Sequence, residues 1–390
     1  MRVRYWTNRF DFDDIEAPAA RLAQALVERG HHVTAVTLSD RDQLLATSSL
    51  NGVAVATVGL RPAVAAGDAL APRLAEAFAD HEQPAPDVEH IELAGEAPAL
   101  ALLQLAREPR PAVVTVHSAL PDSTADADDI GAIALRTAAR VVVDSRALLG
   151  QLKAFLADRC AAEYVAPGLP RTEVVPGPRL LRRPRLLCVG PLVRDSGFDV
   201  AIDALAAIRE RFSTVGLVIV GTGPERAALE RRADALGVRG AVEFREPVPL
   251  DRLPALVNEA SLVLVPARNP VSSSAIAILA GQLLRPVVAS SIGGLPEVVE
   301  QHGSGLLVLP EDPAALAGAV RRLLAEPGSS ADLGRRGRTL ARERFGWDRY
   351  VGDYERLLRE AAAQPPRPVA LPHSSLAELV ALATSGPSAL

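Results

Sequence analysis

The stretch LLCVGPLVRDSGFDVAIDAL (Leu186–Leu205) joins an apolar run to an amphipathic segment through a turn that contains glycine. The run Arg185–Val189 predicts a strand, and Val200–Arg211 predicts a helix because its apolar residues recur at helical spacing. A strand followed by a turn and a helix is the first part of a βαβ unit. The stretch therefore predicts an α/β fold with a parallel sheet.

The same alternation continues through the second half of the chain. Uninterrupted Val, Ile and Leu content is typical of strands buried on both faces, and it predicts strands at Gly216–Val220, Ala241–Phe244, Ser261–Val265, Pro286–Ser290 and Gly305–Leu309. Helices are predicted between them at Glu225–Leu236, Asp251–Ala260, Ala275–Leu284 and Pro313–Leu324.

The first half shows the same pattern with weaker signals. Strands are predicted at Arg2–Trp6, His32–Thr37, Val53–Gly59, Asp87–Glu92, Ala112–His117 and Arg140–Asp144. Between the first two, Ala17–Arg29 places alanines and leucines on one helical face, with Pro18 in the first turn and Gly30 at the C-terminal stop.

Three prolines and a glycine in Val175–Arg185 interrupt the periodicity and predict a domain boundary. We therefore expect two doubly wound, Rossmann-like domains, residues 1–178 and 179–345, facing across a cleft. A C-terminal helix over 346–363 is expected to return toward the N-terminal domain. The tail, 364–390, is Pro-rich and carries a short amphipathic segment, which is either a frayed terminus or a docking segment.

The composition excludes several classes of protein. The 390 residues contain 42 Lys and Arg against 47 Asp and Glu, and this net charge of −5 argues against a nucleic-acid partner. No apolar run is long enough to predict a membrane span, and no signal peptide is recognised, so we expect a cytoplasmic protein. The histidines and cysteines show no zinc-ligand spacing, and nucleotide-cofactor fingerprints are missing, so neither a metal nor a cofactor is expected.

Four stretches in the second half resemble the nucleotide-sugar half of the bacterial retaining glycosyltransferases of family 4, which have the GT-B fold. They occur in the family's order, at Leu186–Leu205, Val218–Glu230 (VIVGTGPERAALE), Pro286–Glu300 (PVVASSIGGLPEVVE) and Glu343–Tyr350 (ERFGWDRY). The first half resembles the family more weakly, through Leu22–Thr37, Val113–Ser118 and Ala138–Leu148. The resemblance implies retaining transfer of a sugar from a nucleotide-type donor to a small acceptor.

The chain departs from the family at four positions that bind the donor. The family loop G-R-L-x-x-x-K-G reads GPLVRDSG at Gly190–Gly197, with Pro191 and Ser196 at the two cationic positions. The family's Glu-x7-Glu pair, which contacts the donor sugar and ribose, falls on Val271 and Leu279. Two cationic and two carboxylate contacts to the donor are therefore replaced.

The loop after the first strand also differs from the family, which presents glycines to the donor phosphates there. Asn8–Pro18 (NRFDFDDIEAP) contains Asp11, Asp13, Asp14 and Glu16. These carboxylates would repel a diphosphate and attract a cationic acceptor, such as an amino sugar or aminocyclitol, or a metal. The alternative is a solvated segment leading into a helix, whose dipole favours negative charge.

Other groups remain that could hold an anion. They are glycine turns, a serine run at the start of a predicted helix, and two arginines beside the degenerate loops: Gly221 and Gly223, Gly293 and Gly294, Ser272, Ser273 and Ser274, Arg194 and Arg268. Each has a structural alternative, because the fold itself can require the glycines, a serine can cap the helix, and arginines are common on surfaces.

His117 is the candidate catalytic residue. It ends a predicted strand, at the edge of the sheet where open α/β folds bind ligands. In the resembling family a histidine in a similar position lies near the transferred sugar. The alternative is a hydrogen-bonded structural histidine.

Two functions therefore stay open. The first is a divergent glycosyltransferase with a small-molecule sugar donor and a small, cationic or neutral, acceptor. The second is a catalytically dead pseudoenzyme that binds a ligand or a protein partner, because removing one contact to developing charge costs about 3 kcal/mol and four such contacts are replaced.

Overall fold

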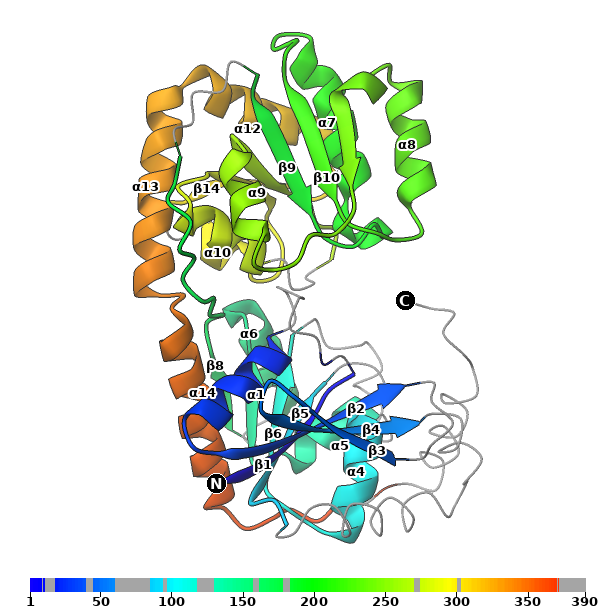
Figure 1. Cartoon of the computed structure of the whole chain (residues 1–390), viewed down its shortest axis with the longest axis vertical. Helices are drawn as coiled ribbons and strands as arrows, with labels where there is room; N and C mark the ends of the chain where they lie inside the picture. The colour runs from blue at the N-terminus through cyan, green and yellow to red at the C-terminus, as the bar shows by residue number, and fades with distance from the viewer. Residues whose placement is uncertain are drawn as a thin grey trace. The chain divides into compact units, whose positions relative to one another are not determined.

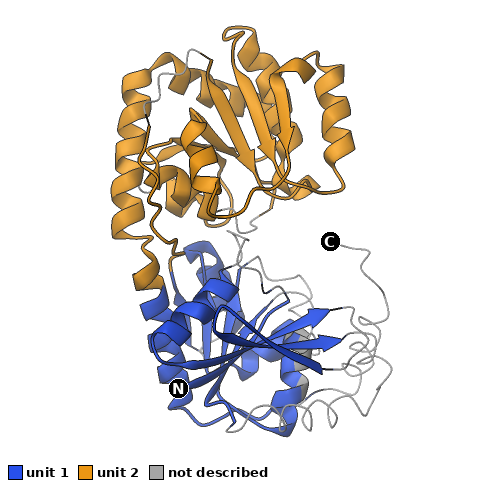
Figure 2. Cartoon of the chain, in the orientation of Figure 1, with its two compact units in different colours: residues 1–12, 17–165, 351–390 blue, residues 13–16, 166–350 orange. Residues whose placement is uncertain are grey.

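The computed structural model describes residues 1–8, 10, 18–39, 45–59, 85–93, 97–117, 130–156, 161–177, 183–269, 274–299, 303–369 and 371. Internal contacts divide the chain into two compact units, which Figure 2 colours separately. Unit 1 is built from the described residues within 1–12, 17–165 and 351–390, and unit 2 from those within 166–350. The chain passes from unit 1 to unit 2 after Val165 and returns after Tyr350.

The sheet of unit 1 is parallel except at one edge. Its described strands are β1 Arg2–Trp6, β2 His32–Ser39, β3 Leu45–Leu50, β4 Val53–Gly59, β5 Val88–Glu92, β6 Ala112–Val116, β7 Arg140–Val143 and β8 Ala161–Tyr164. They follow the order β3-β4-β2-β1-β5-β6-β7-β8, in which β3 alone runs antiparallel to its neighbour. Val3 pairs with Val33 on one side and Val88 on the other, so β1 lies between the two halves of the sheet.

Helices bury apolar faces against this sheet. They are α1 Ala19–Glu28, α4 Ala97–Arg107, α5 Ile130–Thr137 and α6 Arg146–Leu156 (Figure 1). Side chains of α4, α5 and α6 pack with Trp6, Val114 and Val141 in one cluster. Helix α1 buries the face that its sequence predicted, with Leu22 and Leu26 fully buried.

Unit 2 contains a parallel sheet that is covered on both faces. Its described strands are β9 Arg185–Val189, β10 Gly216–Val220, β11 Val242–Arg245, β12 Leu262–Val265, β13 Val287–Ser290 and β14 Gly305–Val308, in the order β11-β10-β9-β12-β13-β14. The helices are α7 Phe198–Arg209, α8 Arg226–Ala235, α9 Leu253–Glu259, α10 Ser274–Gln282, α11 Leu295–Val299, α12 Pro313–Ala325 and α13 Pro327–Glu343, with 3-10 turns η3 Arg194–Ser196 and η4 Arg239–Ala241.

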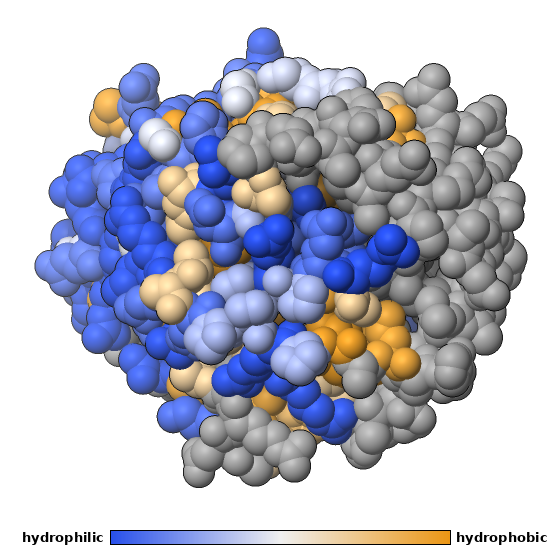
Figure 3. All heavy atoms as spheres, turned by 90° about the horizontal axis from the view of Figure 1, so that it is seen from below, coloured by the Kyte–Doolittle hydropathy of each residue, from blue (hydrophilic) through white to orange (hydrophobic). Residues whose placement is uncertain are grey.

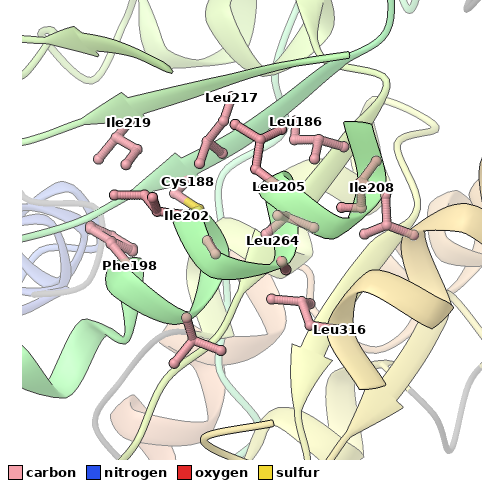
Figure 4. Close-up of a cluster of buried hydrophobic side chains, with 14 of the residues drawn as sticks. Leu186, Cys188, Phe198, Ile202, Leu205, Ile208, Leu217, Ile219, Leu264 and Leu316 are labelled. Atoms are coloured by element: carbon pink, nitrogen blue, oxygen red, sulfur yellow. The ribbon is translucent and has the colours of Figure 1, made fainter. Parts of the chain in front are cut away.

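The stretch that decided the fold lies at the centre of this unit. Leu186 and Cys188 of β9 pack with Ile202 and Leu205 of α7, as Figure 4 shows, in a cluster that also takes side chains from α8 and α12. Leu187, which points to the opposite face of β9, joins a second cluster with α9, α10 and α11. Alternate residues of one strand therefore serve two cores, as a doubly wound sheet requires.

Helix α14, Trp347–Ala362, begins in unit 2 and ends in unit 1. In unit 1 the Glu355 carboxylate accepts a hydrogen bond from Arg29 Nη1 at 2.9 Å and lies 2.8 Å from His31 Nε2. The Tyr354 hydroxyl lies 3.3 Å from Thr115 Oγ1 of β6. Polar contacts as well as apolar packing therefore attach the end of this helix to unit 1.

The fold class expected from the sequence is confirmed, since both sheets are parallel-rich and carry helices. All twelve predicted strands appear, with ends that differ by at most two residues. The sequence did not predict β3 and β8, nor helices α4, α5, α6, α11 and α13. The amphipathic segment of the tail lies outside the described residues.

Few large apolar side chains are exposed among the described residues: Leu50, Val175, Leu236 and Leu309. The face seen in Figure 3 is accordingly mixed, with hydrophilic residues around small apolar areas. None of the described helices combines the length and the hydrophobicity that crossing a membrane would need.

Candidate functional site

The strand order of unit 1 reverses between β1 and β5, and in open α/β sheets ligands bind outside the carboxyl ends of the strands at such a switch point. Glu92, the last residue of β5, lies there. It accepts hydrogen bonds from the hydroxyls of Tyr5 and Thr7, each at 2.7 Å. The buried carboxylate therefore joins the ends of the two strands at the switch point.

His117 follows β6 and lies between two carboxylates. Its Nε2 is 3.5 Å from Glu92 Oε1, and its Nδ1 is 3.5 Å from Asp144 Oδ2, where Asp144 follows β7. The side chain of His117 is 25% exposed, so one part of the ring faces solvent. Three neighbouring strands thus present a carboxylate, an imidazole and a carboxylate at the same edge of the sheet.

Electrostatics fix the protonation of this cluster. Burial favours neutral imidazole, but hydrogen bonds and charges from Asp144 and Glu92 outweigh it and raise the pKa of His117 to about 10. Burial also opposes ionisation of Glu92, yet the hydrogen bonds from His117, Tyr5 and Thr7 lower the pKa of that carboxyl group. At neutral pH the cluster therefore holds an imidazolium between two carboxylates.

Buried polar residues of β1, β5 and β6 pack next to the cluster inside the sheet. His90 stacks on Tyr5 with ring centroids 4.2 Å apart, and its Nε2 lies 2.8 Å from Thr115 Oγ1. Burial lowers the pKa of His90 to about 4, so this histidine is neutral. Glu89 accepts hydrogen bonds from Arg4 at 3.1 Å and from Trp6 Nε1 at 2.7 Å. These contacts hold β1 and β5, and thereby Tyr5, in fixed positions.

The sequence singled out His117 but not its two carboxylate partners. A usable signal existed, because the predicted strands Asp87–Glu92 and Arg140–Asp144 both end in an acidic residue. What the sequence could not supply was the strand order β5-β6-β7, which brings Glu92 and Asp144 to either side of His117.

In unit 2 the strand order reverses between β9 and β12. The loop after β9 packs against the glycine turn after β10, where Leu192 N–H donates to Thr222 O at 2.7 Å and Glu225 N–H donates to Leu192 O at 2.9 Å. A Cβ added to Gly221 would lie 1.9 Å from Gly190 O, and one added to Gly223 would lie 2.4 Å from Leu192 O. The close approach of the two loops therefore already requires both glycines.

Pro191 and Ser196, which the sequence placed at the two cationic positions, contact each other in the loop after β9. Ser196 Oγ donates a hydrogen bond to Pro191 O at 2.6 Å, so the serine closes its own loop. Leu279, which the sequence placed at the second glutamate position, is buried in the core with other residues of α10.

Arg268, in the loop after β12, donates four side-chain hydrogen bonds to protein groups. Its Nη1 and Nη2 donate to the two carboxylate oxygens of Asp199 at 2.7 Å each, and its Nε donates to Glu311 at 2.8 Å. The same Nη1 donates to Arg194 O at 2.8 Å. Burial opposes ionisation of Asp199, but the hydrogen bonds from Arg268 lower the pKa of its carboxyl group.

The other predicted residues are distributed as follows. Gly293 and Gly294 form the turn before α11, in which Gly294 O accepts from Glu297 N–H at 3.1 Å. Ser274 is the first residue of α10. The remaining candidates lie outside the described residues: Asp11, Asp13, Asp14, Glu16, Val271, Ser272 and Ser273. Within the part of the chain that is described, no group of three or more His, Cys, Asp and Glu side chains could hold a metal ion.

Two family models match the chain, one in each half. The model described as Glycosyltransferase Family 4 matches residues 15–172, and the model described as Glycosyl transferases group 1 matches residues 183–326.

Curated relatives agree with these matches. The chain is 35% identical over 250 residues to a D-inositol 3-phosphate glycosyltransferase of Salinispora tropica, over 58% of this chain and 52% of that protein. It is 32% identical over 213 residues to a GDP-mannose-dependent alpha-(1-6)-phosphatidylinositol monomannoside mannosyltransferase of Mycobacterium tuberculosis, over 50% of this chain and 55% of that protein. The chain spans about half the length of the curated relatives it matches.

A solved structure shares the whole fold. Sucrose-phosphate synthase from Thermosynechococcus elongatus matches with a TM-score of 0.74 at 21% identity, over 92% of this chain and 98% of that chain.

Proposed function

Because the chain belongs to the family 4-like glycosyltransferases of the GT-B fold, we propose that it transfers a sugar, with retention, from a nucleotide-type donor to a small acceptor. The observation that carries the proposal is the Glu92–His117–Asp144 cluster at the carboxyl ends of β5, β6 and β7. It combines buried charge, partial exposure and a position beside the switch point of the sheet, which are features of ligand sites.

His117 acts in this proposal as a cation that positions two carboxylates. With a pKa of about 10 it keeps its proton at neutral pH, which makes it a poor general base. Both N–H groups of the imidazolium face carboxylates, Nε2 toward Glu92 and Nδ1 toward Asp144. The remaining lone pairs of these carboxylates can accept hydrogen bonds from hydroxyl groups of the acceptor.

The net charge of the Glu92–His117–Asp144 cluster indicates which class of acceptor it can bind. One imidazolium between two carboxylates leaves a net negative charge, which suits hydroxyl groups or a cation better than a phosphate. The names of the two relatives point to acceptors that carry an inositol ring. We therefore propose a polyol or amino-polyol acceptor, with Asp11, Asp13, Asp14 and Glu16 as further carboxylates toward it.

A second function, a pseudo-glycosyltransferase that binds a ligand or a protein partner, is favoured by the donor-side loops of unit 2. Ser196 is hydrogen-bonded to Pro191 O, and Arg268 is hydrogen-bonded to Asp199 and Glu311, so these polar groups already have protein partners where a donor phosphate would need them. If the chain is active, its turnover is expected to depend on Arg268 and on the serines 272–274.

The deciding experiment uses the full chain with UDP-, GDP- and ADP-sugars and a panel of neutral and cationic polyols. Release of nucleoside diphosphate that requires an acceptor, together with a product of unchanged anomeric configuration by NMR, supports the proposal. His117→Gln should lower turnover at least about tenfold, because it removes the cation that positions Glu92 and Asp144, whereas the exposed control His32→Gln should not. No product from any donor, with ligand binding retained, would favour the pseudoenzyme.

Charge removal on the acceptor side separates the acceptor classes. The double variant Asp13→Asn/Asp14→Asn should weaken the use of cationic acceptors and spare neutral ones, more clearly at low salt because exposed charges are screened at high salt. Equal effects on cationic and neutral acceptors would favour the alternative interpretation, in which Asn8–Pro18 is a solvated segment that leads into a helix.

A further inference from the structure

Arg268 spans the switch point of unit 2, where the fold is expected to bind its ligand. It follows β12, and its side chain contacts Asp199 in the first turn of α7 and the Arg194 carbonyl in the loop after β9, while its backbone N–H donates to Asp195 O. Strands β9 and β12 are the neighbours between which the strand order reverses. The guanidinium therefore lies at the carboxyl edge of the sheet, in the place that an anionic ligand of this fold would occupy.

The third partner of Arg268 has an unusual backbone. Glu311, two residues before the start of α12, has φ of +58°, a left-handed conformation that favours glycine and is strained for glutamate. Its side chain is 61% exposed, yet its carboxylate accepts from Arg268 Nε at 2.8 Å. The strained residue thus places an exposed carboxylate on a cation whose side chain is only 14% exposed.

The two carboxylates hold Arg268 differently. Asp199 accepts from Nη1 and Nη2 and belongs to the first turn of α7, where it is half-buried. Glu311 takes only the Nε–H. Removing Glu311 would leave Arg268 oriented by Asp199 and would expose the Nε–Nη2 edge, which can bind two phosphate oxygens at once.

The surrounding charges oppose an anion as long as Glu311 stays in place. The described parts of the three loops and the first turn of α7 carry Arg194 and Arg268 against Asp195, Asp199, Glu311 and Asp312, so the negative charges are in excess. Pro191 and Ser196 add no positive charge. Glu311 is the more exposed of the two carboxylates that contact Arg268, and its departure would leave the guanidinium with Asp199 as its one carboxylate partner among the described residues.

We propose that Arg268 is the phosphate-binding cation of this chain and that Glu311 competes with the ligand for it. A diphosphate group binds by displacing the Glu311 carboxylate from Arg268 Nε, while Asp199 keeps the guanidinium in position. The proposal rests on the nucleotide-type donor of the proposed function, and it assigns to that donor a cation and an internal competitor.

The test is calorimetric titration of UDP and of inorganic pyrophosphate into the full chain and its variants at low salt. Glu311→Gly should bind both about tenfold or more tightly than wild type, since one charge-assisted contact is exchanged. Glycine suits the positive φ, so the thermal midpoint should stay or rise. Glu311→Asn, whose side chain tolerates the same backbone, should also gain affinity. Glu210→Gln, which removes an exposed carboxylate at the other end of α7, should not.

The gain must depend on Arg268. In Glu311→Gly/Arg268→Ala the affinity should fall back to the wild-type value or below it. Equal affinities of wild type, Glu311→Gly and Glu311→Asn would overturn the proposal, and so would a gain that survives the loss of Arg268. Turnover by the wild-type chain without an affinity gain in the Glu311 variants would overturn this proposal and leave the proposed transferase activity standing. An affinity gain without turnover would support this proposal and contradict the proposed transferase activity.

Discussion

At the scale of single residues, two histidines in unit 1 are driven to opposite charge states by their neighbours. His117 keeps its proton because Asp144 and Glu92 outweigh its burial. His90 is fully buried, its Nδ1 has no hydrogen-bond partner, and the charge of Glu92 only partly offsets the effect of burial. The two rings therefore titrate on either side of neutrality.

His90 should make the protein sensitive to acid. Its pKa is about 4 in the folded chain against 6.5 for an unperturbed histidine, so between these values the unfolded state binds more protons. Stability should therefore fall as pH drops, by about 2 kcal/mol from His90 alone between pH 7 and pH 5. Urea unfolding of wild type and His90→Gln at pH 7 and pH 5 measures how much of the loss in unfolding free energy comes from His90. An equal loss in the two proteins would contradict the assignment, and His32→Gln is the exposed control.

Asp144 should control the charge of His117. An opposite charge this close shifts a pKa by about 1–3 units, so Asp144→Asn should lower the pKa of His117 from its value of about 10 by that amount. Because the pKa of His117 is raised in the folded chain, protonated His117 contributes its full stabilisation below pH 6.5, and this contribution is lost as pH rises through 10. Asp144→Asn should lose the same contribution at a lower pH. NMR titration of the His117 ring measures the shift without requiring activity. An unchanged titration would remove Asp144 from the cluster.

At the scale of elements, the sequence predicted buried strands well because they are continuous apolar runs. It missed β3, whose residues Thr47–Leu50 are exposed at the edge of the sheet and carry little apolar signal. It missed α4, in which apolar residues are nearly continuous and leave no helical period. Glu92 and Asp144 were missed for another reason, since their role depends on which strands are neighbours, and strand order is not written in local periodicity.

The Glu355 carboxylate should contribute to the attachment of helix α14 to unit 1. Glu355 is contacted by Arg29, His31 and Arg359, and hydrogen bonding from His31 lowers the pKa of its carboxyl group against the effect of burial. Glu355→Gln should destabilise the protein by about 1–3 kcal/mol, as the loss of a partner in a partly buried ion pair does. Chemical denaturation at pH 7 measures the change. Glu343→Gln, exposed at the end of α13, is the control, and equal stabilities of the two variants would contradict the anchoring role.

At the scale of the whole molecule, each unit has a switch point, and the two carry different side chains. The switch point of unit 1 has a compact, charged cluster around His117. At that of unit 2, Ser196 is hydrogen-bonded to Pro191 O, and Arg268 is paired with the carboxylates of Asp199 and Glu311. We therefore propose that this chain has the fold of its family but holds a diphosphate weakly.

Calorimetric titration of UDP, GDP and ADP into the wild-type chain tests this claim most directly. We expect each to bind with a Kd weaker than about 10⁻⁴ M, which corresponds to less than about 5.5 kcal/mol of binding free energy. Leu279→Glu alone should not tighten binding, because the buried position restores no phosphate contact. Micromolar affinity of the wild-type chain for any of the three nucleotides would contradict the account.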